Sequence, residues 1–328
     1  LANTSGSSNV AIGSIALRYN TTGLDNVAVG TSALATNTSG CRNAAVGRAA
    51  LYYNTTGLYN TASGYGALKA NTTASNNAAF GYGALINNTT GTCNTATGVV
   101  ALYSTTTANG NTASGGWSLF ANTTGNYNTA TGHHALTCNT TGASNTAVGY
   151  AALYYNTTAS KNAALGECAL YTNTTGIRNT AVGQWALKAN TTGKQNTASG
   201  NYALRSSTTG CKNTASGYET LNGTTTGSHN TATGSSALVA TNSGWCNTAS
   251  GARAGAGNGT GHCNIFLGAN ADTSCSSHNN QIIIGYGAAG AGTNKTVIGN
   301  AATTNTYICG ALSKGSGTFL IPHPDPAK

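Results

Sequence analysis

The sequence predicts an all-β protein, a parallel β-solenoid built from about sixteen coils of 17 residues. An asparagine recurs at this interval from Asn9 to Asn264 with no insertion or deletion, and a glycine four residues later recurs from Gly13 to Gly285. Alanine and leucine keep fixed places in the same period, whereas Gly, Asn and Thr in every turn would disfavour a helix. Repeats this regular, with apolar residues in phase, indicate coils that bury a shared core only by stacking.

We number each repeat from its asparagine, so that the segment 145–161, NTAVGYAALYYNTTASK, holds positions one to seventeen. Positions one to five are small or β-branched and predict a short strand. Positions seven to eleven, residues 151–155, predict a second strand. Turn-forming residues at 149–150 and 156–159 separate the two. We therefore expect two strands and two turns in each coil.

Alternation along the first strand assigns its faces. Ala147 and Gly149 should point into the coil, where nearly invariant small residues indicate a tightly packed interior. Thr146 and Val148 should point outward, and the variation at positions two and four suits a surface or a subunit interface.

The asparagine at position one is expected to form a ladder of side-chain amides along the rod. Stacked coils place identical residues above one another, and the amides can bond backbone groups of the turns that would otherwise lack partners. The predicted ladder includes Asn128, Asn145, Asn162 and Asn179.

The repeat predicts one elongated body, a solenoid rod over residues 1–312 with degenerate closing coils at 252–312. In the closing coils Gly255 and Asp272 replace the leucine of position nine, and the strands become more apolar. Residues 313–328 are expected to be a linker and an extended tail. The chain opens at Leu1 inside a repeat, so we expect it to be a fragment of a longer protein.

Charge and hydropathy limit the kinds of partner that the protein is expected to bind. Only 6% of residues are charged, and the 14 Lys and Arg against 5 Asp and Glu, a net charge of +9, stand singly along the chain. No basic run resembles a nucleic-acid-binding tail, so no nucleic-acid partner is expected. No stretch approaches the roughly 20 apolar residues that span a bilayer, so no membrane insertion is expected.

The sequence offers few candidate residues for catalysis or metal binding. Glu167 and Glu219 stand three coils apart, about 14 Å at strand spacing, whereas a glycosidase pair needs about 5–9.5 Å. Only pairing across chains would rescue such a dyad, so a polysaccharide-degrading spike is the weakest reading. His133 and His134 are expected to be a solvated pair. We predict no enzyme activity, no metal and no cofactor.

Two modifications stay open at this stage. Cys246 and Cys263 share one position in adjacent coils, and a strand spacing of about 4.8 Å falls within the usual Cα range of a disulfide, about 4.4–6.8 Å. Free thiols facing solvent are the alternative. The acceptor pattern for N-glycosylation recurs at position twelve, although an Asn-Thr-Thr-Gly turn explains the same triplets. The sites considered are Asn20, Asn54, Asn139, Asn156, Asn173 and Asn190.

Position ten carries a line of aromatic and basic residues. Rings in a row can stack on sugars, and neighbouring cations can bind anionic groups; a stripe of contacts between subunits is the alternative. The predicted glycan-contact stripe consists of Tyr52, Tyr103, Phe120, Tyr154, Tyr171, Lys188 and Arg205.

The strand motif, NVAIG at 9–13, NVAVG at 26–30 and NTAVG at 145–149, resembles the head repeats of YadA-like trimeric autotransporter adhesins. This resemblance implies a left-handed parallel β-roll and three chains side by side, although a 17-residue coil is longer than the usual head repeat. The motifs at 280–285 and 294–300 also look like fibre proteins of phages and large algal viruses. In those, a segment like 315–324 precedes a self-cleaving intramolecular chaperone, which is absent here and would have been removed or lie beyond Lys328.

These observations predict a structural fibre or adhesin: a rigid rod, extracellular, on a cell surface or on a virion, that attaches to surface glycans and assembles with itself as a homotrimer or filament. The alternative is an ice-binding solenoid, in which rows of threonine hydroxyl and methyl groups order water. The face is interrupted by Val29, Val46, Phe80 and Leu165, and β-propensity alone would favour threonine. The rows comprise Thr95/Thr97, Thr112/Ser114, Thr129/Thr131, Thr197/Ser199, Thr214/Ser216, Thr231/Thr233 and Thr248/Ser250.

Overall fold

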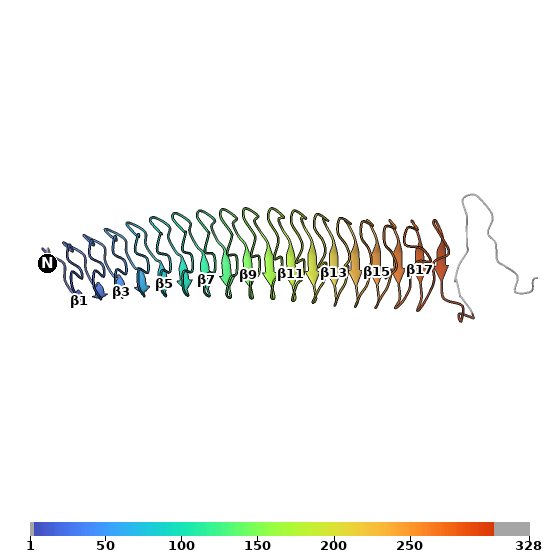
Figure 1. Ribbon diagram of the computed structural model, residues 1–328, viewed down its shortest axis with the longest axis horizontal. Coiled ribbons are helices and arrows are strands. Elements are labelled where there is room, and N and C mark those ends of the chain that lie inside the picture. The colour runs from blue at the N-terminus through green and yellow to red at the C-terminus, as the bar shows by residue number, and fades with distance from the viewer. Residues whose placement is uncertain (1–2, 305–328) are drawn as a thin grey trace, which may run out of the picture.

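The computed structural model describes residues 3–304 as a long rod of stacked coils (Figure 1). Each coil contributes one short strand to a single parallel sheet of eighteen strands, and the described residues contain no helix. This confirms the predicted all-β parallel solenoid. The strands are β1 (Val10–Ile12), β2 (Val27–Val29), β3 (Ala44–Val46), β4 (Thr61–Ser63), β5 (Ala78–Phe80), β6 (Thr95–Thr97), β7 (Thr112–Ser114), β8 (Thr129–Thr131), β9 (Thr146–Val148), β10 (Ala163–Leu165), β11 (Thr180–Val182), β12 (Thr197–Ser199), β13 (Thr214–Ser216), β14 (Thr231–Thr233), β15 (Thr248–Ser250), β16 (Ile265–Leu267), β17 (Ile282–Ile284) and β18 (Thr296–Ile298).

Register is uniform, because every strand pairs with the equivalent residues of the coils before and after it. Ala147 of β9 lies opposite Ala164 of β10, and Thr146 lies opposite Ala163. The middle residue of nearly every strand is buried and its two neighbours are largely exposed, as alternation predicts. Positions two and four therefore form one continuous outer face along the rod.

The predicted second strand, residues 151–155, is wrong. These residues form a turn in which Ala151 and Leu153 adopt left-handed backbone angles, each with φ of 52°. Ala152 and Leu153 are consecutive and both fully buried. An extended strand cannot point two successive side chains to the same side, whereas the left-handed backbone at Leu153 lets both side chains point toward the core. Each coil therefore has one strand, and the rest of the coil consists of turns and bends.

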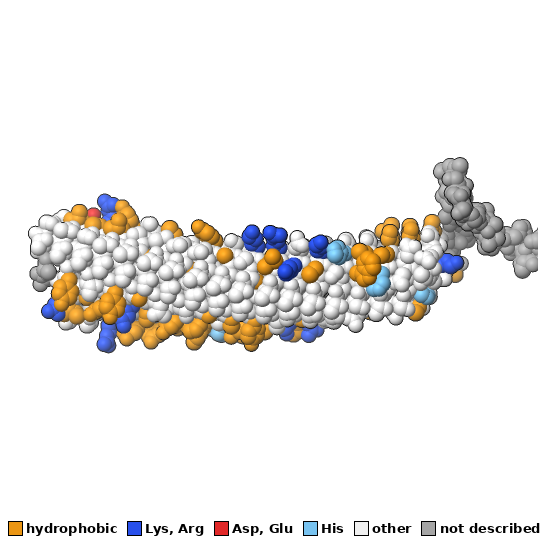
Figure 2. Space-filling view, turned by 90° about the horizontal axis from the view of Figure 1, so that it is seen from above, with side chains coloured by type: hydrophobic (Ala, Val, Ile, Leu, Met, Phe, Trp, Pro, Cys, Tyr) orange, Lys and Arg blue, Asp and Glu red, His pale blue; other side chains and the backbone are white. Residues whose placement is uncertain are grey.

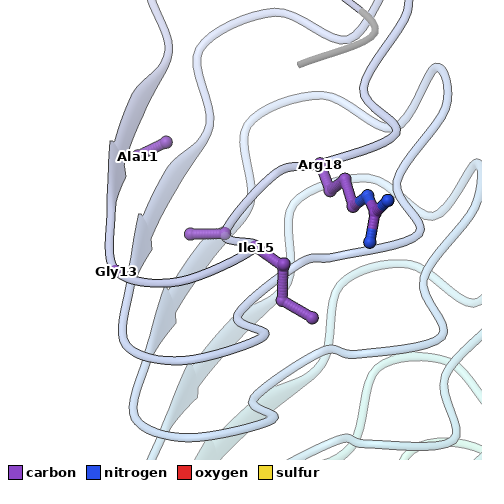
Figure 3. Close-up of a pocket in the computed structure, with 5 residues that line it drawn as sticks. Ala11, Gly13, Ile15 and Arg18 are labelled. Carbon is purple, nitrogen blue, oxygen red and sulfur yellow. The ribbon is translucent and has the colours of Figure 1, made fainter.

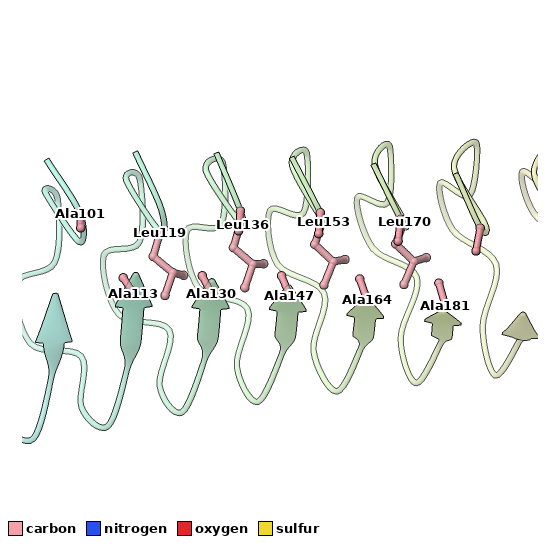
Figure 4. Packing of buried hydrophobic residues seen from close by; sticks show 14 of the residues in the cluster. Ala101, Ala113, Leu119, Ala130, Leu136, Ala147, Leu153, Ala164, Leu170 and Ala181 are labelled. Carbon is pink, nitrogen blue, oxygen red and sulfur yellow. The ribbon is translucent and has the colours of Figure 1, made fainter. Parts of the chain in front are cut away.

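The core is a column of three small or medium side chains per coil. The strand alanine at position three meets the alanine and leucine of positions eight and nine, as Figure 4 shows for Ala147 facing Leu153 and for the coils on either side. Alanine and leucine repeat because each site offers a single volume, bounded above and below by its own copies.

Two asparagine ladders run along the rod, and both bond the turn carbonyl at position fifteen. At position one, Asn145 Nδ2 donates to the side-chain oxygen of Asn128 at 3.2 Å and to the carbonyl of Ala159 at 2.8 Å. At position twelve, Asn156 Nδ2 donates to Asn139 Oδ1 at 2.8 Å and also to Ala159 at 2.9 Å. The amides thus satisfy buried turn carbonyls that no backbone N–H reaches.

The position-twelve ladder is interrupted where the next coil carries a residue other than asparagine. Asn88 Oδ1 is buried with no hydrogen-bond partner, because the next coil carries Thr105, whose hydroxyl bonds the carbonyl of Asn122 instead. Asn190 Oδ1 is likewise buried without a hydrogen-bond partner, because the next coil carries Ser207 at position twelve. A buried acceptor without a donor is destabilising.

Thr105→Asn is therefore expected to stabilise the rod. The introduced amide can donate to Asn88 Oδ1 and accept from Asn122, so the free energy of unfolding should rise by about 1 kcal/mol. Thermal melting measures the change, with Thr124→Asn, at an exposed turn position, as the control. A lower melting temperature, or an equal rise in the control, would contradict the ladder as the cause.

The closing coils keep the core filled by exchanging volumes. Phe266 takes the place of the strand alanine and is buried, and Gly255 takes the place of the leucine facing it. A Cβ at Gly255 would lie 2.6 Å from the Phe266 ring, so the glycine leaves the room that the phenyl group fills. The predicted tail, residues 313–328, lies outside the described residues.

Candidate functional site

The residues of the predicted stripe lie on one edge of the rod, where the chain turns after each strand. Apolar side chains gather along the lower edge of the rod in Figure 2, and basic side chains lie among them. Position ten is joined on this edge by position seven, because the left-handed turn folds the two together. We define the aromatic ridge as Tyr103, Trp117, Phe120, His134, Tyr154, Tyr171, Trp185, Lys188 and Arg205.

Successive coils stack their rings along the ridge. Tyr103 and Phe120 lie 5.2 Å apart between ring centroids with planes 16° apart, and Tyr154 and Tyr171 lie 5.4 Å apart at 25°. Thr137 interrupts position ten between the two stacks. The aromatic line continues past this gap because His134, at position seven, lies 5.7 Å from Tyr154.

Beyond the tyrosines the ridge becomes basic. The ammonium of Lys188 lies 4.1 Å from the centre of the Trp185 ring, and the guanidinium of Arg205 lies 4.9 Å from the same ring. Both are cation–π contacts, which hold the charges against the surface. The indole N–H of Trp185 is shielded from solvent and has no hydrogen-bond partner.

Two adjoining hollows lie on this part of the ridge. One, of about 330 Å³, is lined by His134, Tyr150, Ala151, Tyr154, Cys168, Tyr171 and Lys188. The next, of about 440 Å³, is lined by Lys188, Arg205, Thr172, Ala189 and Ser206. Lys188 belongs to both, so the hollows form one shallow groove with aromatic walls at one end and cations at the other.

Burial shifts the pKa values of three side chains that line the groove. Desolvation raises the pKa of Tyr154 and of Tyr171, so both phenols remain hydrogen-bond donors at neutral pH. Desolvation, with a smaller contribution from neighbouring His133, lowers the pKa of His134. The imidazole is therefore neutral near pH 7, and the charge of the groove comes from Lys188 and Arg205.

No protein-family model matches the chain, and no curated protein matches it. The described residues contain no group of three or more His, Cys, Asp and Glu side chains placed to hold a metal ion. Within residues 3–304 no helix is long and apolar enough to cross a membrane.

The acidic and histidine candidates of the sequence contact their neighbours. Glu167 accepts a hydrogen bond from Gln184 at 2.8 Å, and the rings of His133 and His134 meet edge to face with their centroids 4.0 Å apart.

The predicted stripe contains the residues of position ten but none of position seven. Tyr52, assigned to the stripe, contacts Tyr53 and stands apart from the other rings. Trp117, His134 and Trp185 complete the ridge, and their signal was an aromatic ring or histidine three residues before a stripe position or its gap. Only the left-handed turn makes this spacing a contact.

The asparagines considered for glycosylation lie inside the coil. Asn20, Asn54, Asn139, Asn156, Asn173 and Asn190 are buried, with exposures of 0–2%. Each donates its Nδ2 hydrogens within the ladder, as Asn173 does to Asn156 and Gly176. A glycan on that nitrogen is incompatible with the observed coil, so the turn explains the triplets. Cys246 and Cys263 are free, exposed thiols, the second of the two alternatives.

The largest hollow near the start of the rod has a structural origin. Ala11, Gly13, Ile15, Ala16 and Arg18 line a space of about 350 Å³ (Figure 3). Ala11 is exposed, whereas the strand alanines of the following coils are buried. The hollow is thus the open end of the core column, and no convergent polar groups line it.

Proposed function

We propose that this protein is a rigid attachment rod that binds carbohydrate through the aromatic ridge, in an extracellular or virion-associated setting. The groove beside Tyr154 and Tyr171 carries this proposal. Aromatic faces stack on the apolar faces of sugar rings, and neighbouring donors fix their hydroxyl groups. The stacked tyrosines supply the faces, while Lys188, which lines both hollows, supplies a donor.

Glycan-array binding tests the ridge. Tyr154→Ala/Tyr171→Ala should lower affinity roughly tenfold or more, because it removes both stacking faces while alanine, as at Ala35, is a native residue at position ten. Tyr19→Ala/Tyr286→Ala is the matched control, since it removes two exposed tyrosines far along the rod. Equal binding by wild type and the ridge variant would contradict the proposal.

The outer sheet face favours a second candidate, ice binding. From β1 to β18 neither position two nor position four carries a charged residue, and between β6 and β15 threonine occupies position two in nine of ten strands. These side chains are exposed and repeat at strand spacing of about 4.8 Å. Regular rows of hydroxyl and methyl groups could hold water in an ordered array.

Thermal hysteresis of the purified rod tests this second function. If the face binds ice, Thr214→Lys at its centre should remove most of the hysteresis, because a long hydrated side chain breaks the flat surface. Thr158→Lys, at an exposed turn position, is the control and should retain it. Absence of hysteresis in the wild-type rod would leave the threonines as residues that favour strands.

Association into a homotrimer or filament stays a prediction, which light scattering of a dilute solution checks. The sheet face offers exposed apolar side chains at both ends, at Val10 and Ile12 in β1 and at Ile265 and Leu267 in β16. Large apolar patches are uncommon on monomers, so burial between copies would account for these residues.

A further inference from the structure

A second edge of the rod carries a line of cations that is inconspicuous in the sequence. Positions sixteen and seventeen lie just before each strand, on the edge away from the aromatic ridge, and hold Lys161, Arg178, Lys194, Lys212 and His229 in five successive coils. All five are exposed. Figure 2 shows basic side chains gathered midway along the upper edge, with histidine following them. We call the four Lys and Arg residues the cationic row.

Backbone hydrogen bonds hold the main chain that carries this row. The N–H at position seventeen donates to the carbonyl at position sixteen of the preceding coil, as in Lys212 to Lys194 at 2.9 Å and His229 to Cys211 at 3.0 Å. The residues at position seventeen adopt left-handed backbone angles in coil after coil, including Lys161 at 62° and Arg178 at 58°. One cation therefore leaves the rod in each of four successive coils, from position seventeen in three of them and from the adjacent position sixteen at Lys194.

No acidic side chain among the described residues forms an ion pair with the row. In residues 3–304 one ion pair is present, Arg42 with Asp25 at 3.7 Å, which lies several coils away. Glu167 and Glu219 stand at positions six and seven, beyond the strand on the opposite edge. Exposed like charges at this spacing lie within a Debye length of about 8 Å of one another at physiological salt. Their fields add, so the row attracts anions more strongly than scattered lysines would.

An aromatic platform continues the same edge. Trp245, at position sixteen of the coil after His229, is 46% exposed, and its ring lies 5.1 Å from that of His262 in the next coil. A solvent-facing tryptophan in line with a row of cations is suited to a ligand that has both apolar ring faces and negative charges.

We propose that the cationic row and Trp245 form a binding track for a linear anionic polysaccharide that carries about one carboxylate or sulfate per sugar. The cations follow at one per coil, and a coil rises by about 4.8 Å, which is close to the length of one pyranose ring with its glycosidic link. Duplex DNA repeats its charges at about 3.4 Å along each strand, and an extended acidic peptide at about 3.3 Å per residue. Neither stays in step with one cation per coil. This site is separate from the aromatic ridge and does not depend on its function.

Affinity measurements on the whole chain test the track with two probes. Polygalacturonate presents carboxylates alone and a sulfated dextran presents sulfates, so the two distinguish the sources of charge, and unmodified dextran is the neutral reference. The wild type should bind at least one of the charged polymers, with affinity that falls as salt rises, and should ignore dextran.

The variant K161Q/R178Q/K194Q/K212Q should bind the charged polymers about a hundredfold more weakly, an estimate that assumes four exposed ion pairs. Glutamine is a native residue at position seventeen, where Gln195 has φ of 58°, so the fold should tolerate the changes. The control R18Q/R48Q/R253Q/K295Q removes equal charge from exposed sites off the row and should keep most of the affinity. Trp245→Ala should weaken binding without changing its salt dependence.

Several results would overturn the proposal. These are no binding of either charged polymer by the wild type, equal loss in the row variant and the control, or tighter binding of duplex DNA than of both polysaccharides. Thermal melting of each variant shows whether a loss of binding reflects unfolding. The Tyr154→Ala/Tyr171→Ala variant should bind the charged polymers normally, so failure of the ridge and failure of the track are distinguishable.

Discussion

Gly115→Ala is expected to destabilise the centre of the rod by about 2–6 kcal/mol, from backbone strain and overpacking together. Gly115 occupies position five, with φ of 132°, a conformation that side chains of L-residues rarely adopt. A Cβ there would lie 2.6 Å from the carbonyl oxygen of Gly132 and 2.7 Å from its carbon. Both obstacles are backbone atoms of the next coil, which cannot move without disturbing the sheet.

The neighbouring glycine provides a matched control for this substitution. Gly116 lacks the unusual φ, and the nearest atom to its Cβ would be a side-chain carbon of His133 at 3.3 Å, which can shift. Gly116→Ala should therefore change stability little. Denaturant melts measure both variants, and hydrogen exchange should localise the Gly115→Ala effect to a few adjacent coils, because each repeat contacts only its neighbours. Similar small losses in the two variants would contradict the close approach of coils at position five.

Periodicity was sufficient to predict the strand and the core but not the path between them. The strict recurrence of the strand alanine predicted a buried position, and Ala147 is buried as expected. The interpretation failed at Ala152 and Leu153, because an alternating pattern and a left-handed turn both leave apolar residues in phase. Nothing in the composition of Leu153 indicates a positive φ, which leucine ordinarily avoids.

The candidate sites show the same limit. Position ten was recognisable because Tyr154 and Tyr171 share one place in the repeat, but Trp185 joins them only through the turn. The basic residues looked scattered because Lys161 and Lys212 are far apart in sequence. Stacking converts a separation of 17 residues into one coil, so charges that are sparse along the chain become dense along an edge.

The second asparagine ladder had a misleading signal. The Asn-Thr-Thr triplets match a glycosylation acceptor, yet Asn156 is fully buried and its amide bonds the coils on both sides. An acceptor motif describes what an enzyme recognises in an unfolded chain, whereas the ladder depends on residues 17 positions away. The amide is thus best tested through its contribution to stability.

Asn156→Ala is expected to lower the free energy of unfolding by about 2–5 kcal/mol, since each buried group left unpaired costs about 1–3 kcal/mol. Among the described residues, the substitution removes the only donor to Asn139 Oδ1 and one of the two acceptors of Asn173 Nδ2. Asn156→Ser should be milder, because the chain already carries Ser207 at position twelve. Thr158→Ala, at an exposed turn position, is the control. In denaturant melts, the free energy of unfolding should fall most for Asn156→Ala, less for Asn156→Ser and least for the control. Equal stability of Asn156→Ala and the control would mean that water replaces the amide, and that the stacked alanines and leucines alone hold the coils together.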